Sequence, residues 1–261
     1  MDLGLNGKIA IVTGASRGIG RAIARELAKE GCDIVATARD AGALDSLKQD
    51  IGRTFGRKAV IHAADLREPH AAEAVVAAAV KEFGRVDILV NNAGATKRGP
   101  FLTLTDADFL DGFALKFHAA VRLTRAAWPH LKAAKGCIVN IAGVGARHGA
   151  AEFAIGGAVN SAVLNFTKAM ADLGIADGVR VNAINPGWIE TDRLKTRLAA
   201  RAKAEGIGDA EVRRLSLAEL GVSRFGQPEE IAQLVCFLAS GPAAYLQGAL
   251  IDADGGETRY L

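Results

Sequence analysis

The sequence predicts an α/β protein in which a doubly wound parallel sheet carries helices on both faces. Short apolar segments alternate with segments of helical period along nearly the whole chain. The apolar segments lack the polar alternation of a half-exposed strand, so both faces of each strand are expected to be covered. Such alternation, with right-handed connections, gives a parallel sheet between two helical layers.

The predicted elements follow one another in chain order. Strands are expected over residues 8–12, 33–37, 58–63, 86–91, 136–141, 179–184 and 249–252. Helices are expected over residues 18–30, 41–55, 70–83, 106–132 and 153–173. One long charged insertion, residues 188–225, is interrupted by Gly206 and Gly208 and predicts a helical lid. No repeat or linker divides residues 1–261, so a single domain is expected.

Composition limits the classes of function. Half of the 261 residues are hydrophobic and 23% are charged, which indicates a folded, soluble chain. Lys and Arg (32) barely exceed Asp and Glu (29), a balance that favours neither nucleic acid nor a membrane surface as partner. The absence of an 18-residue apolar run and of a signal-like N-terminus predicts a cytoplasmic protein. Cys32, Cys137 and Cys236 have no metal-ligand spacing, so no metal is expected. Cys137 and Cys236 lie in apolar runs and are expected to be buried thiols.

A glycine-rich turn follows the first predicted strand and opens a helix. It reads Thr13-Gly14-Ala15-Ser16-Arg17-Gly18-Ile19-Gly20. Glycines there allow the backbone to approach a pyrophosphate, whose charge faces the helix N-terminus. The turn therefore predicts a dinucleotide site of the Rossmann type.

This turn resembles the T-G-x-x-x-G-x-G fingerprint of the short-chain dehydrogenase/reductase family. Further motifs that resemble the family's occur in order at residues 65–66, 91–94 (N-N-A-G), 180–187, 224–232 and 252–256. The resemblance covers nearly the whole chain and is greatest to 3-oxoacyl-carrier-protein reductases. It implies a Rossmann fold and these cofactor contacts: Gly14, Ser16, Arg17, Gly18, Ile19, Gly20, Arg39, Asp65, Leu66, Asn92, Ala93, Gly94, Pro186, Gly187, Ile189 and Thr191.

The end of the second strand indicates which dinucleotide is bound. An acid there would bind the ribose 2′-hydroxyl and repel a 2′-phosphate. Ala38 stands at that place with Arg39 beside it, and Arg17 adds a second cation in the glycine turn. We therefore expect NADP(H) as cofactor. The alternative is that both arginines are solvated surface residues.

The resemblance also implies where catalytic residues should lie. Family members that reduce carbonyls use an Asn-Ser-Tyr-Lys tetrad with the tyrosine as general acid. Alignment on the flanking motifs puts those four positions at Lys116, Gly143, Gly156 and Asn160. Tyr245 and Tyr260 are the only tyrosines, so the usual proton transfer cannot run within this subunit as aligned. The two glycines predict a cavity beside the nicotinamide.

Lys116, His148 and Asn160 are the candidate catalytic residues. Lys116 and Asn160 exchange the amide and the lysine of the tetrad, so the Lys116 ammonium is expected close to Asn160. There it could hold the ribose, act as an electrophile or, with a lowered pKa, donate a proton; alternatively it extends to solvent. His148 is either a replacement acid or an exposed loop residue. A further alternative is that Tyr260 reaches across an oligomer interface.

Two functions remain open from the sequence. The first is an NADP(H)-dependent oxidoreductase that acts on a carbonyl or alcohol of a small molecule by a non-tyrosine mechanism. The second is a catalytically silent NADP(H)-binding protein, either a redox sensor or a partner subunit. A third, weaker possibility is another reaction class on the same scaffold.

Apolar residues on helices 106–132 and 153–173 predict a homo-oligomer, by resemblance a tetramer. Residues 193–214 carry seven Lys or Arg against three Asp or Glu, which favours either an anionic substrate or a solvated lid.

Overall fold

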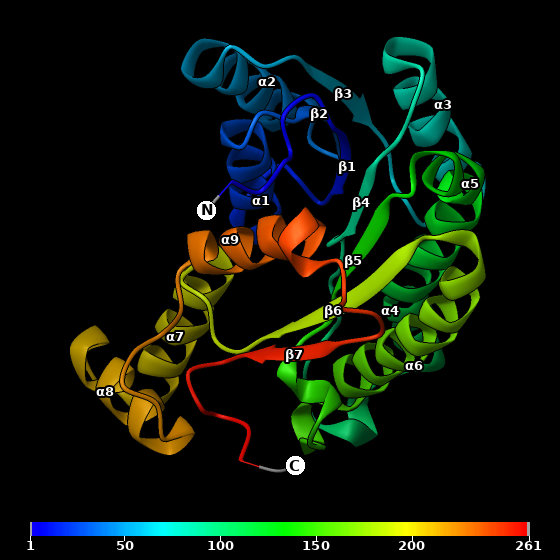
Figure 1. The fold of residues 1–261 in the computed structure, drawn as a ribbon. Coiled ribbons are helices and arrows are strands. Elements are labelled where there is room, and N and C mark those ends of the chain that lie inside the picture. Colours follow the sequence, from blue (N-terminus) through cyan, green and yellow to red (C-terminus); the bar gives the residue numbers. More distant parts are fainter. Residues whose placement is uncertain (1, 260–261) are drawn as a thin grey trace.

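Seven parallel strands form one sheet in the order β3-β2-β1-β4-β5-β6-β7 (Figure 1). The computed structural model describes residues 2–259. Its strands are β1 (Ile9–Thr13), β2 (Asp33–Ala38), β3 (Ala59–Ala63), β4 (Ile88–Asn91), β5 (Cys137–Ile141), β6 (Arg180–Pro186) and β7 (Leu250–Ala253). The predicted doubly wound parallel sheet is confirmed. The strand order reverses between β1 and β4, which opens a crevice at their carboxyl ends.

Helices cover both faces of the sheet. They are α1 (Gly18–Lys29), α2 (Ala41–Phe55), α3 (Ala71–Phe83), α4 (Asp106–Phe113), α5 (Ala119–Ala134), α6 (Ala154–Asp177), α7 (Asp192–Glu205), α8 (Asp209–Leu220) and α9 (Pro228–Ala239). Ala10 and Val12 of β1 pack in one cluster with α1, α2 and α9, whereas Ile11 packs in another with α3 and α5. Successive side chains of each strand enter opposite cores, which explains why the strands are uniformly apolar.

The helix expected over residues 106–132 is interrupted. A π-helical turn, Ala114–His118, separates α4 from α5. Such turns insert an extra residue into a helix and often occur at functional sites. Lys116 lies in this turn, so its side-chain direction differs from that in a continuous helix.

The lid expected over residues 188–225 is helical and consists of α7 and α8, which extend beyond the strand ends at the lower left of Figure 1. Helix α9, which follows the lid, is not among the helices expected from the sequence. That helix begins at Pro228, in the first helical position, and has a capping box between Gln227 and Glu230. Cys137 and Cys236 are buried and free, as predicted, and Cys32 is buried and free as well. Between residues 2 and 259, no helix combines the length and apolarity needed to cross a membrane.

Candidate active site

The glycine turn between β1 and α1 packs directly against the end of β4. Asn92 donates from Nδ2 to the carbonyl of Thr13 at 2.9 Å, and the Thr13 hydroxyl accepts from the amides of Asn92 and Ala93 at 2.9 Å. A Cβ on Gly20 would lie 2.3 Å from the Gly14 carbonyl oxygen and 2.4 Å from Asn92 Nδ2. Only glycine fits there, because the neighbouring atoms belong to backbone and to a hydrogen-bonded amide.

The N-terminus of α1 is free to receive an anion. Arg17 occupies the N-cap without a side-chain cap, and the first helical turn holds no acidic residue. The unpaired N–H groups and the helix dipole therefore face the crevice with positive charge. The lid begins beside this turn, since Thr191 Cγ2 lies 3.3 Å from the place of a Cβ on Gly18.

The ends of β2 and β3 lie farther along the same crevice. Ala38 ends β2, and the next residue, Arg39, is exposed. Asp65, after β3, accepts from the amide and the guanidinium of Arg67 at 3.0 and 3.2 Å. Arg67 also binds Asp111 of α4, so this end of the crevice is held by an ion-pair network.

Lys116, in the π-helical turn before α5, and Asn160, on α6, are in direct contact. Lys116 Nζ donates to Asn160 Oδ1 at 2.5 Å and to the Ala142 carbonyl, at the end of β5, at 2.6 Å. The aliphatic part of Lys116 crosses Gly94, where a Cβ would lie 2.9 Å from Cδ. The contact predicted from the exchanged pair is present, and Lys116 does not extend to solvent.

Within residues 2–259, the Lys116 ammonium has no acidic partner. Burial, together with the positive charge of Arg193, lowers the pKa of Lys116 to about 7. An ammonium group has three N–H donors, and the two hydrogen bonds use two of them. One donor therefore remains for a further acceptor.

Gly143, two residues after β5, has a backbone conformation that favours glycine. Its φ is +152°, and a Cβ would lie 3.0 Å from Asn160 Nδ2. The Gly143 amide donates to Asn185 Oδ1 at 3.4 Å, and Asn185 donates to Asp252 of β7 at 2.6 Å. A side chain at position 143 would therefore strain the backbone and crowd the amide of Asn160.

The expected cavity beside Gly143 and Gly156 is absent, and that prediction is wrong. A Cβ on Gly156 would lie 2.0 Å from Cε2 and Cζ of the Phe153 ring. The same ring approaches Gly145, whose Cβ would lie 2.7 Å from Cε1. Phe153, just before α6, therefore folds back over the glycines and fills the space. The guanidinium of Arg98 lies 3.7 Å from the ring centre.

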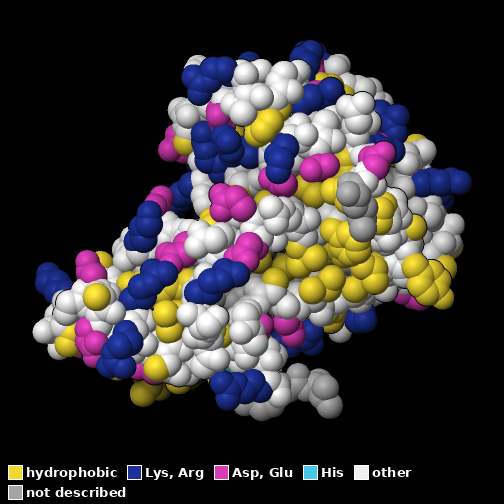
Figure 2. Space-filling view, turned by 60° about the vertical axis from the view of Figure 1, so that its left-hand side comes forward, with side chains coloured by type: hydrophobic (Ala, Val, Ile, Leu, Met, Phe, Trp, Pro, Cys, Tyr) yellow, Lys and Arg dark blue, Asp and Glu magenta, His cyan; other side chains and the backbone are white. Residues whose placement is uncertain are grey.

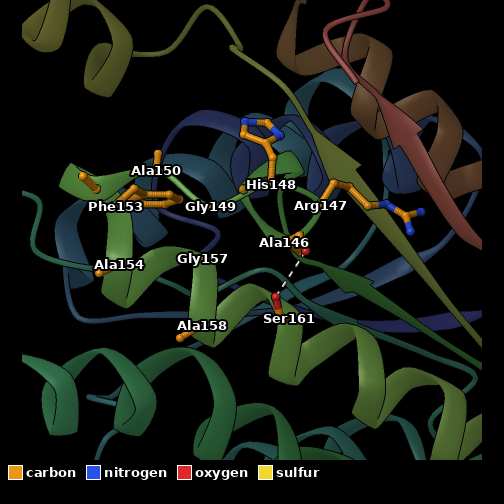
Figure 3. A pocket seen from close by; sticks show the side chains of 12 residues that line it. Ala146, Arg147, His148, Gly149, Ala150, Phe153, Ala154, Gly157, Ala158 and Ser161 are labelled. Carbon is orange, nitrogen blue, oxygen red and sulfur yellow. Dashed lines mark hydrogen bonds between the residues drawn. The ribbon is translucent and has the colours of Figure 1, made fainter. Parts of the chain in front are cut away.

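An open cavity of about 470 Å³ lies between α6 and the loop after β5 (Figure 3). Phe153, Gly157, Ser161 and His148 are among its lining residues, whereas Lys116 and Asn160 are not. The structure therefore does not bring His148 together with the other two candidate catalytic residues. The loop is fixed by Ser161, which donates to the Ala146 carbonyl at 3.2 Å, and by Arg147, which binds Asp252 at 3.1 Å.

A protein-family model described as short chain dehydrogenase matches residues 8–202. The chain belongs to the short-chain dehydrogenase family. It is 38% identical to the 3-oxoacyl-[acyl-carrier-protein] reductase FabG of Vibrio cholerae over 255 residues, which are 97% of this chain and 98% of that protein.

Solved structures of short-chain dehydrogenases share the fold. The L-sorbose reductase of Gluconobacter frateurii, complexed with NADPH and L-sorbose, superposes with a TM-score of 0.96 at 35% identity over the full length of both chains. YwfH, an NADPH-dependent reductase involved in bacilysin biosynthesis, has a TM-score of 0.92 at 28% identity, over 98% of this chain and all of that one.

The short-chain dehydrogenase motifs predicted to contact a cofactor gather along one crevice. Residues of the glycine turn, the N-N-A-G segment and the lid start are in mutual contact there. Sequence reasoning missed four side chains near this crevice, Arg98, Trp188, Arg193 and Arg197. The positive balance of residues 193–214 was the only signal for Arg193 and Arg197, and Arg98 and Trp188 had none. Tyr260 lies outside the described residues, and Tyr245 is fully exposed.

A fifth missed residue is Glu257, which lies after β7 on the C-terminal segment. A Cβ on Gly187 would lie 3.0 Å from its Oε2. Burial raises the pKa of Glu257, while the neighbouring His148 and Arg197 side chains act in the opposite direction. The C-terminal segment thus adds a carboxyl group to the side of the site that holds His148.

Proposed function

We propose that this chain is an NADP(H)-dependent oxidoreductase that interconverts a carbonyl and an alcohol, with Lys116 as its general acid and base. The observation that carries this proposal is the position of the Lys116 ammonium, 2.5 Å from Asn160 Oδ1 and 2.6 Å from the Ala142 carbonyl. On this proposal the family's Asn-Ser-Tyr-Lys positions are Lys116, Gly143, Gly156 and Asn160, and all four are replaced.

The crevice suits NADP(H) in shape and charge. The uncapped α1 N-terminus is suited to the pyrophosphate, and Arg17 and Arg39 are suited to the 2′-phosphate that an acid at the end of β2 would repel. NADPH is also the cofactor named for both structural relatives described above. The residues proposed to hold it are Gly14, Ser16, Arg17, Gly18, Ile19, Gly20, Arg39, Asp65, Leu66, Asn92, Ala93, Gly94, Pro186, Gly187, Ile189 and Thr191. NADPH bound there supplies the hydride.

Lys116 supplies the proton in this proposal. Asn160 and Ala142 fix the ammonium through two hydrogen bonds, and its third N–H is available to a substrate oxygen. A general acid is most effective when its pKa lies near the working pH. The pKa of Lys116, about 7, meets this condition at neutral pH. In the opposite direction the neutral amine accepts the proton of an alcohol. His148 has no part in this step, because it lines the cavity between α6 and the loop after β5, and Lys116 does not line that cavity.

The proposed assembly is a homo-oligomer, a tetramer by analogy with the family. Strand β7 ends the sheet, and Leu250 and Ile251 on it are only partly buried. Leu234 and Phe237 of α9 are partly buried as well. Figure 2 shows hydrophobic side chains gathered in the middle of one face, with charged side chains around them. A second copy would cover such an apolar face and the sheet edge. Light scattering at micromolar concentration checks this; a monomer would contradict it.

NADPH oxidation with near-stoichiometric protein tests the proposed activity. Ketones, aldehydes, quinones and acyl thioesters are offered in turn, and nicotinamide absorbance is followed. Turnover with a ketone or aldehyde supports the oxidoreductase. Tight NADPH binding without turnover of any compound would instead support the silent binding protein.

A further inference from the structure

Two arginines on separate elements stack on aromatic rings. Arg98 belongs to the loop between β4 and α4, and Arg197 belongs to α7 of the lid. The Arg98 guanidinium lies 3.7 Å from the centre of the Phe153 ring, and that of Arg197 lies 3.6 Å from the Trp188 ring. Phe153 also fills the space beside Gly156 and lines the cavity between α6 and the loop after β5, so Arg98 stacks on a ring that belongs to the wall of that cavity.

The stacked guanidinium groups keep their donors free. Stacking on a ring fixes the plane of a guanidinium and leaves its five N–H groups pointing outward from the edge. Within residues 2–259, neither Arg98 nor Arg197 forms an ion pair or hydrogen bond. The two side chains are therefore oriented but unpaired.

Three other arginines of α7 and α8, Arg201, Arg213 and Arg214, bind carboxylates. Arg201 of α7 binds Glu205 and Glu219, and Arg214 of α8 binds Glu211 at 2.6 Å. Their carboxylate partners neutralise them within the lid itself. Arg197 lies only four residues before Arg201 on the same helix, yet within residues 2–259 it has no such partner. Arg193 of α7 likewise binds no carboxylate in that range, and it donates to the Gly94 carbonyl at 3.0 Å.

Positive charge accumulates around Arg98 and Arg197. Burial lowers the pKa of Arg197 to about 10, and the nearby charge of Arg98 contributes in the same direction. Burial also lowers the pKa of Arg98, and the charge of Arg193 adds to this effect. Glu152 and Glu257 offset part of the charge from beyond ion-pair distance. A bound anion would relieve the remaining repulsion.

We propose that the substrate carries an anionic group, a carboxylate or a phosphate, and that Arg98 and Arg197 bind it. Guanidinium groups suit both anions because their paired N–H donors match two oxygen atoms. This inference rests on the proposed function, because it names the group that the substrate carries at the end remote from the carbonyl that faces Lys116. Because Arg197 is on the lid, the anion also links the lid to the loop after β4.

Direct binding tests the anion site without any need for turnover. Trp128 and Trp188 are the only tryptophans, so a Trp128→Phe background makes fluorescence report on the ring beneath Arg197. NADPH-loaded protein is titrated with inorganic phosphate and with succinate at constant ionic strength. We expect saturable binding of at least one, and the preferred anion identifies the group. The double variant Arg98→Gln, Arg197→Gln should bind at least about tenfold more weakly.

Arg214→Gln is the matched control, because it removes the same charge from a paired arginine of the lid. It should bind both anions as the parent protein does. No saturable binding by the parent protein, or equal binding by the double variant, would overturn the inference.

Matched substrates separate this inference from the proposed function. Oxo acids are compared with their methyl esters, and ketose phosphates with the free ketoses. The parent protein should favour a charged member by at least about tenfold in kcat/KM, and the double variant should lose that preference. A preference that survives in the double variant would overturn the inference. If no compound turns over, the proposed function fails, while the binding titration still decides the anion site.

Discussion

The glycine turn after β1 and the glycines around α6 lie at the same edge of the sheet but differ in what surrounds them. Gly20 faces the Gly14 carbonyl and a hydrogen-bonded amide. Gly156 faces the ring of Phe153, a side chain that can rotate. In the first region backbone atoms surround the glycine, so no larger residue fits there. The second is closed by a side chain, so different residues can fill the same volume.

The two regions also differ in electrostatics. The glycine turn presents helix N–H groups without a local acid or cap, which suits a phosphate. The α6 region holds an ammonium between an amide and a carbonyl oxygen, without a carboxylate. The chain thus retains the features that bind a dinucleotide and, on our proposal, exchanges the group that transfers a proton.

The largest expected effect comes from Lys116→Met, which keeps the apolar stem but removes the ammonium. Because a positioned general acid contributes about 100-fold or more, reduction by NADPH should slow by at least about that factor. NADPH affinity, measured by titration, should change far less. Lys203→Met, at an exposed lid lysine, is the control. Unchanged turnover in Lys116→Met would remove Lys116 from the mechanism.

The next largest effect is expected on NADPH affinity, from the two arginines proposed to bind its 2′-phosphate. The double variant Arg17→Ala, Arg39→Ala should bind NADPH at least about tenfold more weakly and lose its preference for NADPH over NADH, because two charges near the 2′-phosphate are removed. Titration of both cofactors against cofactor-free protein measures this. Equal affinities in the parent protein, or a preference retained by the variant, would be inconsistent with the assignment.

The smallest effect compares the two kinds of glycine directly. Gly20→Ala should lower the free energy of unfolding by about 1–3 kcal/mol, because the new methyl group meets backbone that cannot move. Gly156→Ala should cost less, because the Phe153 ring can shift and alanine favours a helix by about 1 kcal/mol. Denaturant titration of both variants tests the ranking. A larger loss for Gly156→Ala would show that the Phe153 ring is held rigidly.

The sequence predicts the sheet well because each strand is buried on both faces, as the side chains of β1 illustrate. It also predicts the meeting of Lys116 and Asn160, since the exchanged residues occupy positions that the fold brings together. It does not reveal the π-helical turn, which keeps the apolar pattern while adding a residue. Nor does it reveal that Phe153 covers Gly156, because loop geometry decides that contact.

The pH dependence of NADPH-driven reduction tests the central role of Lys116 most directly. With a pKa of about 7, the ammonium is protonated at lower pH and loses its proton at higher pH. The kcat/KM for reduction should therefore be constant below about pH 7 and fall roughly tenfold per pH unit above it. The residual activity of Lys116→Met should lack this fall. A wild-type profile that stays flat from pH 6 to pH 9 would contradict the account.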